Sequence, residues 1–254
     1  MAKPFLLVQL SDPHIGADWG AGDPVAGLVA AVESVQRLPD RPDAVLMSGD
    51  LAENAADAEY DVVRDLLAQL GAPFYVLPGN HDDRDTLRRR FDLPGASGTP
   101  VQYTVDLGPL RLVVVDTQRP GEGHGQLDDD RLAWLDAELA AAPDQVTLVA
   151  MHHPPLATGS TAWDELGLPA ADRRALGGVV ERHPQVRRLV AGHVHRTIAA
   201  ELAGRAVLAV PSTYLQARLN FTSPEIELAA EPPGFAVHAV LDGELASHVQ
   251  PVSS

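Results

Sequence analysis

The sequence contains no cysteine among its 254 residues. Disulfide bonds, thiolate nucleophiles and cysteine-ligated zinc sites are therefore excluded, and any bound metal ion must be held by nitrogen and oxygen ligands. Long hydrophobic runs are missing as well, since no stretch approaches the roughly 18 to 20 uncharged apolar residues that a membrane span requires. The apolar run Leu6–Leu10 near the N-terminus is too short for a signal peptide, so we expect a cytoplasmic protein with no membrane partner.

Basic residues are scarce. There are 19 Lys and Arg against 35 Asp and Glu, which gives a formal charge of −16 with neutral histidines. Nucleic-acid binding depends on clusters of Lys and Arg, so this balance argues against a nucleic-acid polymer as a partner. Most of the acidity serves solubility, and some acids are expected to bind metal cations. A phosphate substrate would then be small, and metal ions rather than a basic groove would hold it.

The chain has the apolar content for a sizeable core, because hydrophobic residues make up 45% of it. Its first third alternates strand-length apolar runs with segments of helical spacing. We expect strands at Phe5–Leu10, Asp43–Met47 and Pro73–Leu77, and helices at Asp23–Leu38 and Asp57–Leu70. This alternation predicts βαβ crossovers and a largely parallel sheet.

The rest of the chain changes character. Val101–Leu107 and Leu110–Asp116 resemble two strands joined in a hairpin by Gly108 and Pro109, and the strands from Thr197 onward resemble an antiparallel finish. The remaining expected elements are helices at Asp128–Ala142 and Asp172–Arg182 and strands at Val146–Met151, Val186–Ala191, Thr197–Leu202, Ala206–Val210, Phe235–Leu241 and Leu245–Val249. The pattern predicts one domain over residues 1–254, an α/β, four-layer αββα sandwich of two mixed β-sheets flanked by helices.

Three segments have the composition of loops, namely Gly16–Pro24, Pro94–Pro100 and Leu215–Pro233. The third is the longest, lacks periodicity and ends in two prolines. Long ordered loops are often functional, so residues 215–233 are a candidate lid over the site or a candidate contact with another subunit. An inert surface excursion is the alternative.

Five short polar segments each follow a predicted strand. They are Asp12-Pro-His14, Gly49-Asp50, Gly79-Asn80-His81-Asp82, His152-His153 and Gly192-His193-Val194-His195. In α/β sheets ligands bind beyond the carboxyl ends of the strands, so these nitrogen and oxygen groups are expected to converge at one end of the sheet. The glycine before a ligand permits close approach of the backbone to an ion. Each segment alone is an ordinary turn in most proteins, whereas the joint pattern predicts a metal site.

The number of ligands predicts two metal ions. Asp, His and Asn side chains suit borderline or hard ions such as Mn, Fe, Zn or Co, and the residue types do not choose among them. Two ions roughly 3.5 to 4 Å apart can clamp the attacking and leaving oxygens of an in-line displacement. Water bound to such an ion has its pKa lowered to about 7, which supplies a hydroxide nucleophile without Cys or Ser. The reaction that fits is phosphoester hydrolysis.

The ordered series D-x-H, G-D, G-N-H-D, H and G-H-x-H resembles the calcineurin-like metallophosphoesterases over about residues 5 to 250. Finer features, such as Asp83-Arg84 after the third motif and Pro211-Ser212-Thr213, resemble their bacterial class III cyclic-nucleotide phosphodiesterase and glycerophosphodiesterase branch. The resemblance implies that a first metal ion is held by Asp12, His14 and His195. It implies that a second is held by Asn80, His152 and His193, and that Asp50 bridges both.

The resemblance also implies that His81 binds no metal. It would contact the phosphate and assist the leaving oxygen as a general acid or by hydrogen bonding, with Asn80 and His193 as further substrate-binding candidates. Relatives often read G-D-x-x-D after the second strand, where the last Asp orients the catalytic histidine, but Glu53 stands at that position here. Glu53 and Asp82 are therefore the candidates to orient His81.

The other histidines and the tryptophans receive less specific assignments. His153 either supports the ligands or lines the pocket, or it has no direct role. The histidines outside the motifs, His124, His183, His238 and His248, are expected to be ordinary surface or core residues. Trp19, Trp134 and Trp163 are expected to be packing residues, and Trp163 is the one whose position allows it to reach the pocket.

These observations favour a binuclear-metal-dependent phosphodiesterase that hydrolyses a small diester, foremost 3′,5′-cyclic AMP, by attack of a metal-bound hydroxide. The alternative is a glycerophosphodiesterase, or a broad-specificity phosphomonoesterase and phosphodiesterase of the same fold. A non-catalytic metal-binding scaffold is the remote alternative, because every proposed ligand and His81 are retained. By analogy with relatives, we expect a homodimer or a larger homo-oligomer.

Overall fold

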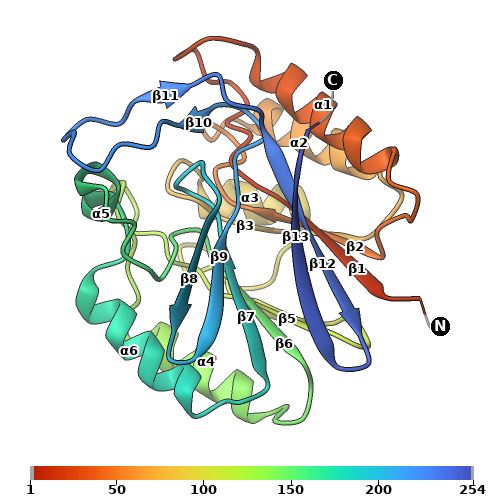
Figure 1. The fold of residues 1–254 in the computed structure, drawn as a ribbon, viewed down its shortest axis with the longest axis vertical. Coiled ribbons are helices and arrows are strands. Elements are labelled where there is room, and N and C mark those ends of the chain that lie inside the picture. The colour runs from red at the N-terminus through yellow and green to blue at the C-terminus, as the bar shows by residue number, and fades with distance from the viewer. Residues whose placement is uncertain (1–2, 253–254) are drawn as a thin grey trace.

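Residues 3–252 of the computed structural model form four layers in the order helices, sheet, sheet, helices (Figure 1). The strand order is β13-β12-β1-β2-β3 in the first sheet and β4-β5-β6-β7-β9-β8 in the second, with a separate ribbon β10-β11. The strands are β1 (Phe5–Leu10), β2 (Ala44–Ser48), β3 (Phe74–Leu77), β4 (Tyr103–Asp106), β5 (Arg111–Val114), β6 (Thr147–Ala150), β7 (Val186–Ala191), β8 (Ile198–Leu202), β9 (Arg205–Ala209), β10 (Gln216–Ala217), β11 (Leu228–Ala229), β12 (Gly234–Leu241) and β13 (Glu244–Pro251). The helices are α1 (Pro24–Gln36), α2 (Asp57–Ala68), α3 (Arg84–Phe91), α4 (Asp129–Ala140), α5 (Thr161–Leu166) and α6 (Ala170–Glu181). The predicted α/β class with two mixed sheets is confirmed.

Three apolar clusters hold the layers together. Leu7 and Leu46 of the first sheet pack against Leu112 and Leu148 of the second, so the two sheets share a central core. The other face of the first sheet packs against α1 and α2, and the other face of the second packs against α4 and α6. Strands buried on both faces need continuous apolar runs, which explains why β1, β2 and β6 are so hydrophobic.

The parallel strands place their carboxyl ends at one edge of the molecule. β1, β2 and β3 pair in parallel in the first sheet, and β5, β6, β7 and β9 do so in the second. All five polar motifs follow one of these strands. Since both sheets contribute, the motifs meet where the two sheets come together.

Two helices were not foreseen. Helix α3 is strongly polar, and its buried Arg84 donates to the Asp116 carboxylate at 2.7 Å, so ionic contacts replace the apolar stripe that pattern reading requires. Helix α5 is only six residues long. The antiparallel finish is confirmed for β8–β9 and β12–β13, whereas β9 also pairs in parallel with β7.

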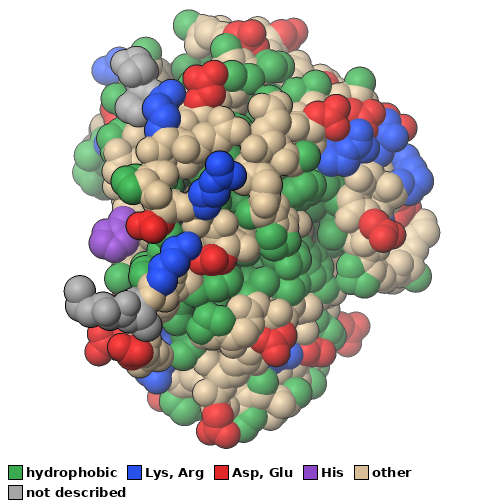
Figure 2. Space-filling model, turned by 90° about the vertical axis from the view of Figure 1, so that its right-hand side faces the viewer, with side chains coloured by type: hydrophobic (Ala, Val, Ile, Leu, Met, Phe, Trp, Pro, Cys, Tyr) green, Lys and Arg blue, Asp and Glu red, His purple; other side chains and the backbone are tan. Residues whose placement is uncertain are grey.

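Acidic and basic side chains are mixed on the surface, with no cluster of Lys and Arg alone on the face that Figure 2 shows. On the face shown in Figure 2, Lys and Arg side chains are interspersed with Asp and Glu around an apolar centre. Arg90 of α3, for example, lies 2.7 Å from Asp61 of α2. Among residues 3–252 the structure has no helix of the length and apolarity that crossing a membrane requires.

A buried polar chain links the two sheets below the motifs. The Gln9 amide donates to Ser48 Oγ at 2.8 Å and to the Ala191 carbonyl at 3.2 Å. Its oxygen accepts from His238 Nε2 at 3.0 Å, so His238 Nδ1 accepts from the Ser247 hydroxyl at 2.7 Å. The His238 ring is thus neutral and fully hydrogen-bonded, and burial lowers its pKa to about 3.

The buried His238 predicts that the folded protein loses stability in acid. Below pH 6.5, the ordinary pKa, the unfolded chain gains a proton on His238 that the folded chain refuses down to about pH 3. The free energy of unfolding should therefore fall by about 1.4 kcal/mol per pH unit across this window because of His238 alone. Urea unfolding of the wild type and His238→Gln between pH 7 and pH 5 checks this, and parallel pH slopes for the two proteins would contradict it.

Candidate metal centre

The structure brings all of the predicted metal ligands together. Asp12 and His14 follow β1, and Asp50 follows β2, while the other four follow β3, β6 and β7. Four groups of three ligand atoms each lie within 4.8 Å of one another among the described residues: Asp12, His14 and His195; Asp12, Asp50 and His152; His14, Asp50 and His81; and His152, His153 and His193. Asp50 Oδ2 is 3.5 Å from His14 Nε2 and 3.2 Å from His152 Nε2. Asp50 therefore lies between the two ligand sets that the sequence predicts.

The first set consists of acceptors that face one another. His14 Nδ1 lies 2.8 Å from the Glu53 carboxylate and His195 Nδ1 lies 2.9 Å from the Leu215 carbonyl, so both Nδ1 atoms carry the proton. When both rings are neutral, the two Nε2 lone pairs point at each other across 3.0 Å. Burial opposes charge on His14, but its hydrogen bond to Glu53 raises its pKa, so a proton competes with a metal ion for this position. Two lone pairs at this distance repel unless a cation lies between them, and protein metal sites hold histidines in this way.

The second set has the same character once His152 has lost the proton that it shares with Asp50. His152 Nδ1 donates to the Ser48 carbonyl at 2.9 Å, and His193 Nε2 donates to the Leu166 carbonyl at 3.0 Å. Their other ring nitrogens lie 3.2 and 3.1 Å from Asn80 Oδ1, which is also an acceptor. The inward-facing nitrogen and oxygen atoms of both sets therefore suit metal cations, one on each side of Asp50.

Several ligands have an unusual backbone. Asp12, His14, Asp50, His193 and His195 all adopt left-handed φ values between 45° and 69°. Residues other than glycine rarely enter this region, and such strain concentrates at functional sites. Backbone hydrogen bonds hold it in place: Asp12 N–H donates to the Gly49 carbonyl at 3.1 Å, and His14 N–H to the Asp50 carbonyl at 3.0 Å.

The motif glycines lie where the backbone closely approaches the side chains of other ligands, and their predicted close approach to an ion stays a prediction. A Cβ at Gly79 would overlap the Asp50 carboxylate, and one at Gly192 would overlap the Ser11 and Asp12 side chains. Gly79 therefore lets the ends of β3 and β2, neighbours in the first sheet, come close together, and Gly192 does the same for β7 and β1 of the two different sheets.

Burial decides the protonation of these histidines. Burial, reinforced by the nearby His14, lowers the pKa of His195 to about 3, and burial also lowers that of His193, so both are neutral and able to bind metal. Burial opposes charge on His152 too, but the Asp50 carboxylate raises its pKa to about 9. Metal binding must displace this proton, so metal affinity increases with pH up to about 9.

Glu53 and Asp82, the two candidates to orient His81, have different partners. Glu53 Oε2 lies 3.5 Å from His81 Nδ1 while it accepts from His14, and its Oε1 accepts from the Trp19 indole at 2.7 Å. The buried Asp82 carboxylate accepts backbone N–H groups of Gly79, Leu51 and Ala52. Asp82 thus ties together the loops after β2 and β3, and Glu53 is the carboxylate that contacts His81.

His153 lies beside the ligands, but both of its ring nitrogens are hydrogen-bonded and neither is free to bind a metal ion. Its Nε2 donates to the Gly123 carbonyl at 3.2 Å, and its Nδ1 accepts from the Thr117 hydroxyl at 2.9 Å. The ring centroid lies 4.4 Å from that of His193 and 4.9 Å from that of His152. His153 therefore supports both ligands by packing.

A pocket of about 200 Å³ opens above the ligands. Besides the ligands and His81, its lining consists of Trp19, Trp163, Leu166, Ile226 and Leu228. The last two come from the 215–233 excursion, which forms one wall and runs above α5 in Figure 1. Trp163 reaches the pocket as its position in the sequence suggests, and Trp19, expected to be a packing residue, lines the pocket as well.

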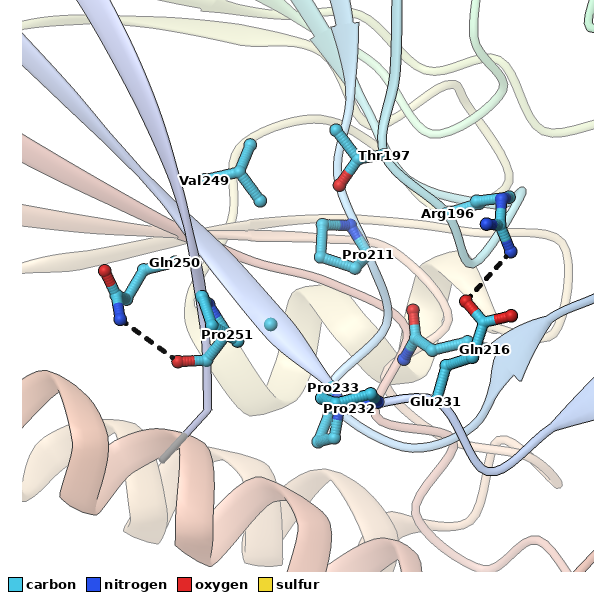
Figure 3. A pocket seen from close by; sticks show the side chains of 11 residues that line it. Arg196, Thr197, Pro211, Gln216, Glu231, Pro232, Pro233, Val249, Gln250 and Pro251 are labelled. Carbon is cyan, nitrogen blue, oxygen red and sulfur yellow. Dashed lines mark hydrogen bonds and ion pairs between the residues drawn. The ribbon is translucent and has the colours of Figure 1, made fainter. Parts of the chain in front are cut away.

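A second hollow lies on the other side of the excursion (Figure 3). Its ionisable lining residues, Arg196 and Glu231, point toward each other and form an ion pair at 3.1 Å. Arg196 also donates to the Ala217 carbonyl at 2.6 Å. Arg196 thus contacts residues near both ends of the 215–233 excursion and holds them next to the ligand His195. The charged residues of this hollow therefore stabilise the excursion.

Comparison with known proteins agrees with this geometry. The chain is 32% identical to the glycerophosphodiester phosphodiesterase GpdQ of Enterobacter lignolyticus (strain SCF1), over 92% of this chain and 86% of that protein. It is 35% identical to the 3′,5′-cyclic adenosine monophosphate phosphodiesterase CpdA of Pseudomonas aeruginosa, over 83% of this chain and 77% of that protein. A dimetal phosphatase from Danio rerio shares the fold with a TM-score of 0.70 at 18% identity, over 99% of this chain and 100% of that one.

Fold and site together define a metal-dependent phosphoesterase, an enzyme whose buried His and Asp clusters fit a binuclear centre. The family model for calcineurin-like phosphoesterases matches residues 5–197. The chain belongs to this family.

Removal of the central carboxylate tests the arrangement. Asp50→Ala should lose metal at one or both positions, because Asp50 Oδ2 lies between the two sets of histidine nitrogens. Metal analysis of the purified variant by plasma mass spectrometry measures the stoichiometry, with the exposed Asp18→Ala as control. Full metal occupancy in Asp50→Ala would rule out the bridging position.

Glu53 yields a separate prediction. Glu53→Gln should keep its metal but lower kcat about 10- to 100-fold, since the amide cannot hold His14 and His81 as the carboxylate does. Glu53→Asp, which keeps the charge on a shorter side chain, should recover part of the rate. The measurement is kcat at saturating metal, and an unchanged kcat in Glu53→Gln would exclude the positioning role.

Proposed function

We propose that the protein hydrolyses small phosphodiesters, with 3′,5′-cyclic nucleotides such as cyclic AMP as preferred substrates. The observation that carries this proposal is the arrangement of Asp50 between two sets of inward-facing histidine lone pairs, beneath a small pocket with apolar walls. The pocket accommodates a small ester rather than a polymer. Its apolar walls suit a nucleoside better than a hydrophilic alcohol.

Asp12, His14 and His195 would hold one cation, Asn80, His152 and His193 the other, and Asp50 both. When bound, the two cations supply charge that polarises the phosphoryl group and lowers the pKa of water, so that water can attack at neutral pH. Manganese, iron and zinc all suit these ligands.

The protein's own contribution to the reaction centres on His81. Its side chain is 35% exposed at the pocket, and its Nδ1 faces Glu53 at 3.5 Å. The carboxylate is placed to orient the ring, which leaves Nε2 facing the position of the leaving oxygen. Asn80 and His193 also line the pocket and are positioned to contact a phosphate oxygen there.

Glycerophosphodiester hydrolysis is the second candidate. The similarity to GpdQ of Enterobacter lignolyticus, at 32% identity, is close to that to CpdA of Pseudomonas aeruginosa, at 35%. The apolar pocket walls favour the nucleotide. The expected self-association of the chain stays a prediction.

His81 separates catalysis from metal binding. His81→Ala should retain both metal ions, because its nitrogen is not needed in either set, but should lower kcat about 100- to 10,000-fold. Turnover with added Mn²⁺ is measured on bis-p-nitrophenyl phosphate, p-nitrophenyl phosphate, cyclic AMP and glycerophosphoethanolamine, alongside metal content.

The outcomes of these assays bear on the proposal as follows. Diester rates well above the monoester rate support a phosphodiesterase, and the two natural diesters rank the candidates. Undiminished turnover in His81→Ala would remove its catalytic role, and a metal-loaded wild type without diesterase activity would remove the proposed function.

A further inference from the structure

Two indoles line the pocket, and neither has a role in the chemistry described above. Trp19 lies in the loop between β1 and α1, and Trp163 lies in α5. Each stands nearly edge-on to a ligand histidine: the ring centroids are 5.0 Å apart for Trp19 and His14, and 5.6 Å for Trp163 and His193. Trp19 therefore lies beside the first ligand set, and Trp163 lies beside both, since its ring centroid is also 6.2 Å from that of His195. Both are half-buried, so each keeps part of its surface open to the pocket.

Trp19 is held rigidly. Its indole N–H donates to Glu53 at 2.7 Å, and the Tyr214 ring packs against it at a centroid distance of 5.3 Å. The Tyr214 hydroxyl also donates to the Trp19 carbonyl at 2.9 Å. An aromatic surface fixed before a ligand arrives loses little entropy on binding. Because Glu53 also accepts from His14, it fixes the position of the indole relative to this metal ligand.

Trp163 lies in a pocket wall that is held by hydrogen bonds within its own segment and lies close to the 215–233 excursion. In the same helix, the Asp164 carboxylate accepts the Thr158 N–H at 2.6 Å and the Gly159 N–H at 3.2 Å. A Cβ built at Gly159 would lie only 3.6 Å from the Phe221 ring, so the loop before α5 lies close to the tip of the 215–233 excursion. Ile226 and Leu228 of that excursion then complete the lining.

The pocket lining has a polar part and an apolar part. Polar side chains that line the pocket are the metal ligands and His81, and the rest of its described lining is aromatic or aliphatic. A glycerol or ethanolamine group would lose water there without gaining hydrogen bonds, which is costly. A planar heterocycle would stack on an indole and keep its polar edge toward the pocket mouth.

We propose that Trp19 and Trp163 form a stacking site for the nucleobase of the substrate and determine the preference for nucleotide diesters. This rests on the proposed function, because the base must belong to a diester whose phosphate reaches His81. Neither indole takes part in the chemical step. Their effect is on the KM of aromatic substrates.

The kinetic test compares two diesters on the same metal-loaded preparations. Trp163→Ala should raise KM for cyclic AMP about tenfold, as expected for loss of one stacking contact, while kcat/KM for glycerophosphoethanolamine changes less than about twofold. Trp163→Phe should restore most of the cyclic AMP affinity. Trp19→Phe keeps an aromatic ring for stacking but loses the Glu53 hydrogen bond, so it should change KM for cyclic AMP little and lower kcat on both diesters alike.

Trp134→Phe is the matched control, because Trp134 lies on α4 and packs against the core of the second sheet. Thermal unfolding of every variant separates loss of folding from loss of recognition. Equal losses of kcat/KM on both diesters in Trp163→Ala, or no change on cyclic AMP in that variant, would overturn the stacking site.

A binding measurement makes the result independent of turnover. AMP should quench tryptophan fluorescence of the wild type and of Trp134→Phe, ribose 5-phosphate should not, and Trp163→Ala should show a weaker response. A wild type that hydrolyses no diester but is quenched by AMP would contradict the proposed function and leave the base site standing. Diesterase activity without quenching by AMP would overturn the base site and leave the function standing.

Discussion

The mutual repulsion of the inward-facing acceptors is the constraint on which the site depends. Four histidines each donate one ring N–H to a carbonyl or carboxylate, namely Leu215, Ser48, Leu166 and Glu53. Their other nitrogens converge with Oδ1 of Asn80 and the carboxylate of Asp50. Without positive charge the arrangement is unfavourable. With cations in place, every nitrogen and oxygen gains a partner.

The backbone is strained to achieve this convergence. A left-handed residue other than glycine costs about 1–3 kcal/mol, so five of them together approach about 5–15 kcal/mol, comparable to the net stability of a typical domain. The two sheets, the strand-end hydrogen bonds and the metal ions must offset this cost. Trp19 lies in the same loop as Asp12 and His14, and Glu53 lies in the same loop as Asp50. The Glu53 carboxylate contacts Trp19 and His14 and lies 3.5 Å from His81. Metal binding, leaving-group assistance and the pocket wall are therefore linked through one carboxylate.

The sequence predicted what depends on residue type and order. The alternation of apolar runs predicts the parallel strands, and the polar residues after them predict the ligands that the structure brings together. It could not show α3, whose buried Arg84 is satisfied by Asp116 instead of by apolar packing. Nor could it place Trp19 in the pocket, because that depends on Tyr214 and Glu53, which are distant in the chain. The choice between Glu53 and Asp82 likewise required three-dimensional contacts.

The most direct test of this account is a crystal structure of the wild-type protein grown with Mn²⁺, with anomalous scattering measured to locate the metal ions. We predict two anomalous peaks, one bound by His14 and His195 Nε2 and the other by His152 Nε2 and His193 Nδ1, with Asp50 between them. A single peak, or metal bound outside these nitrogens, would contradict the binuclear centre on which the mechanism rests.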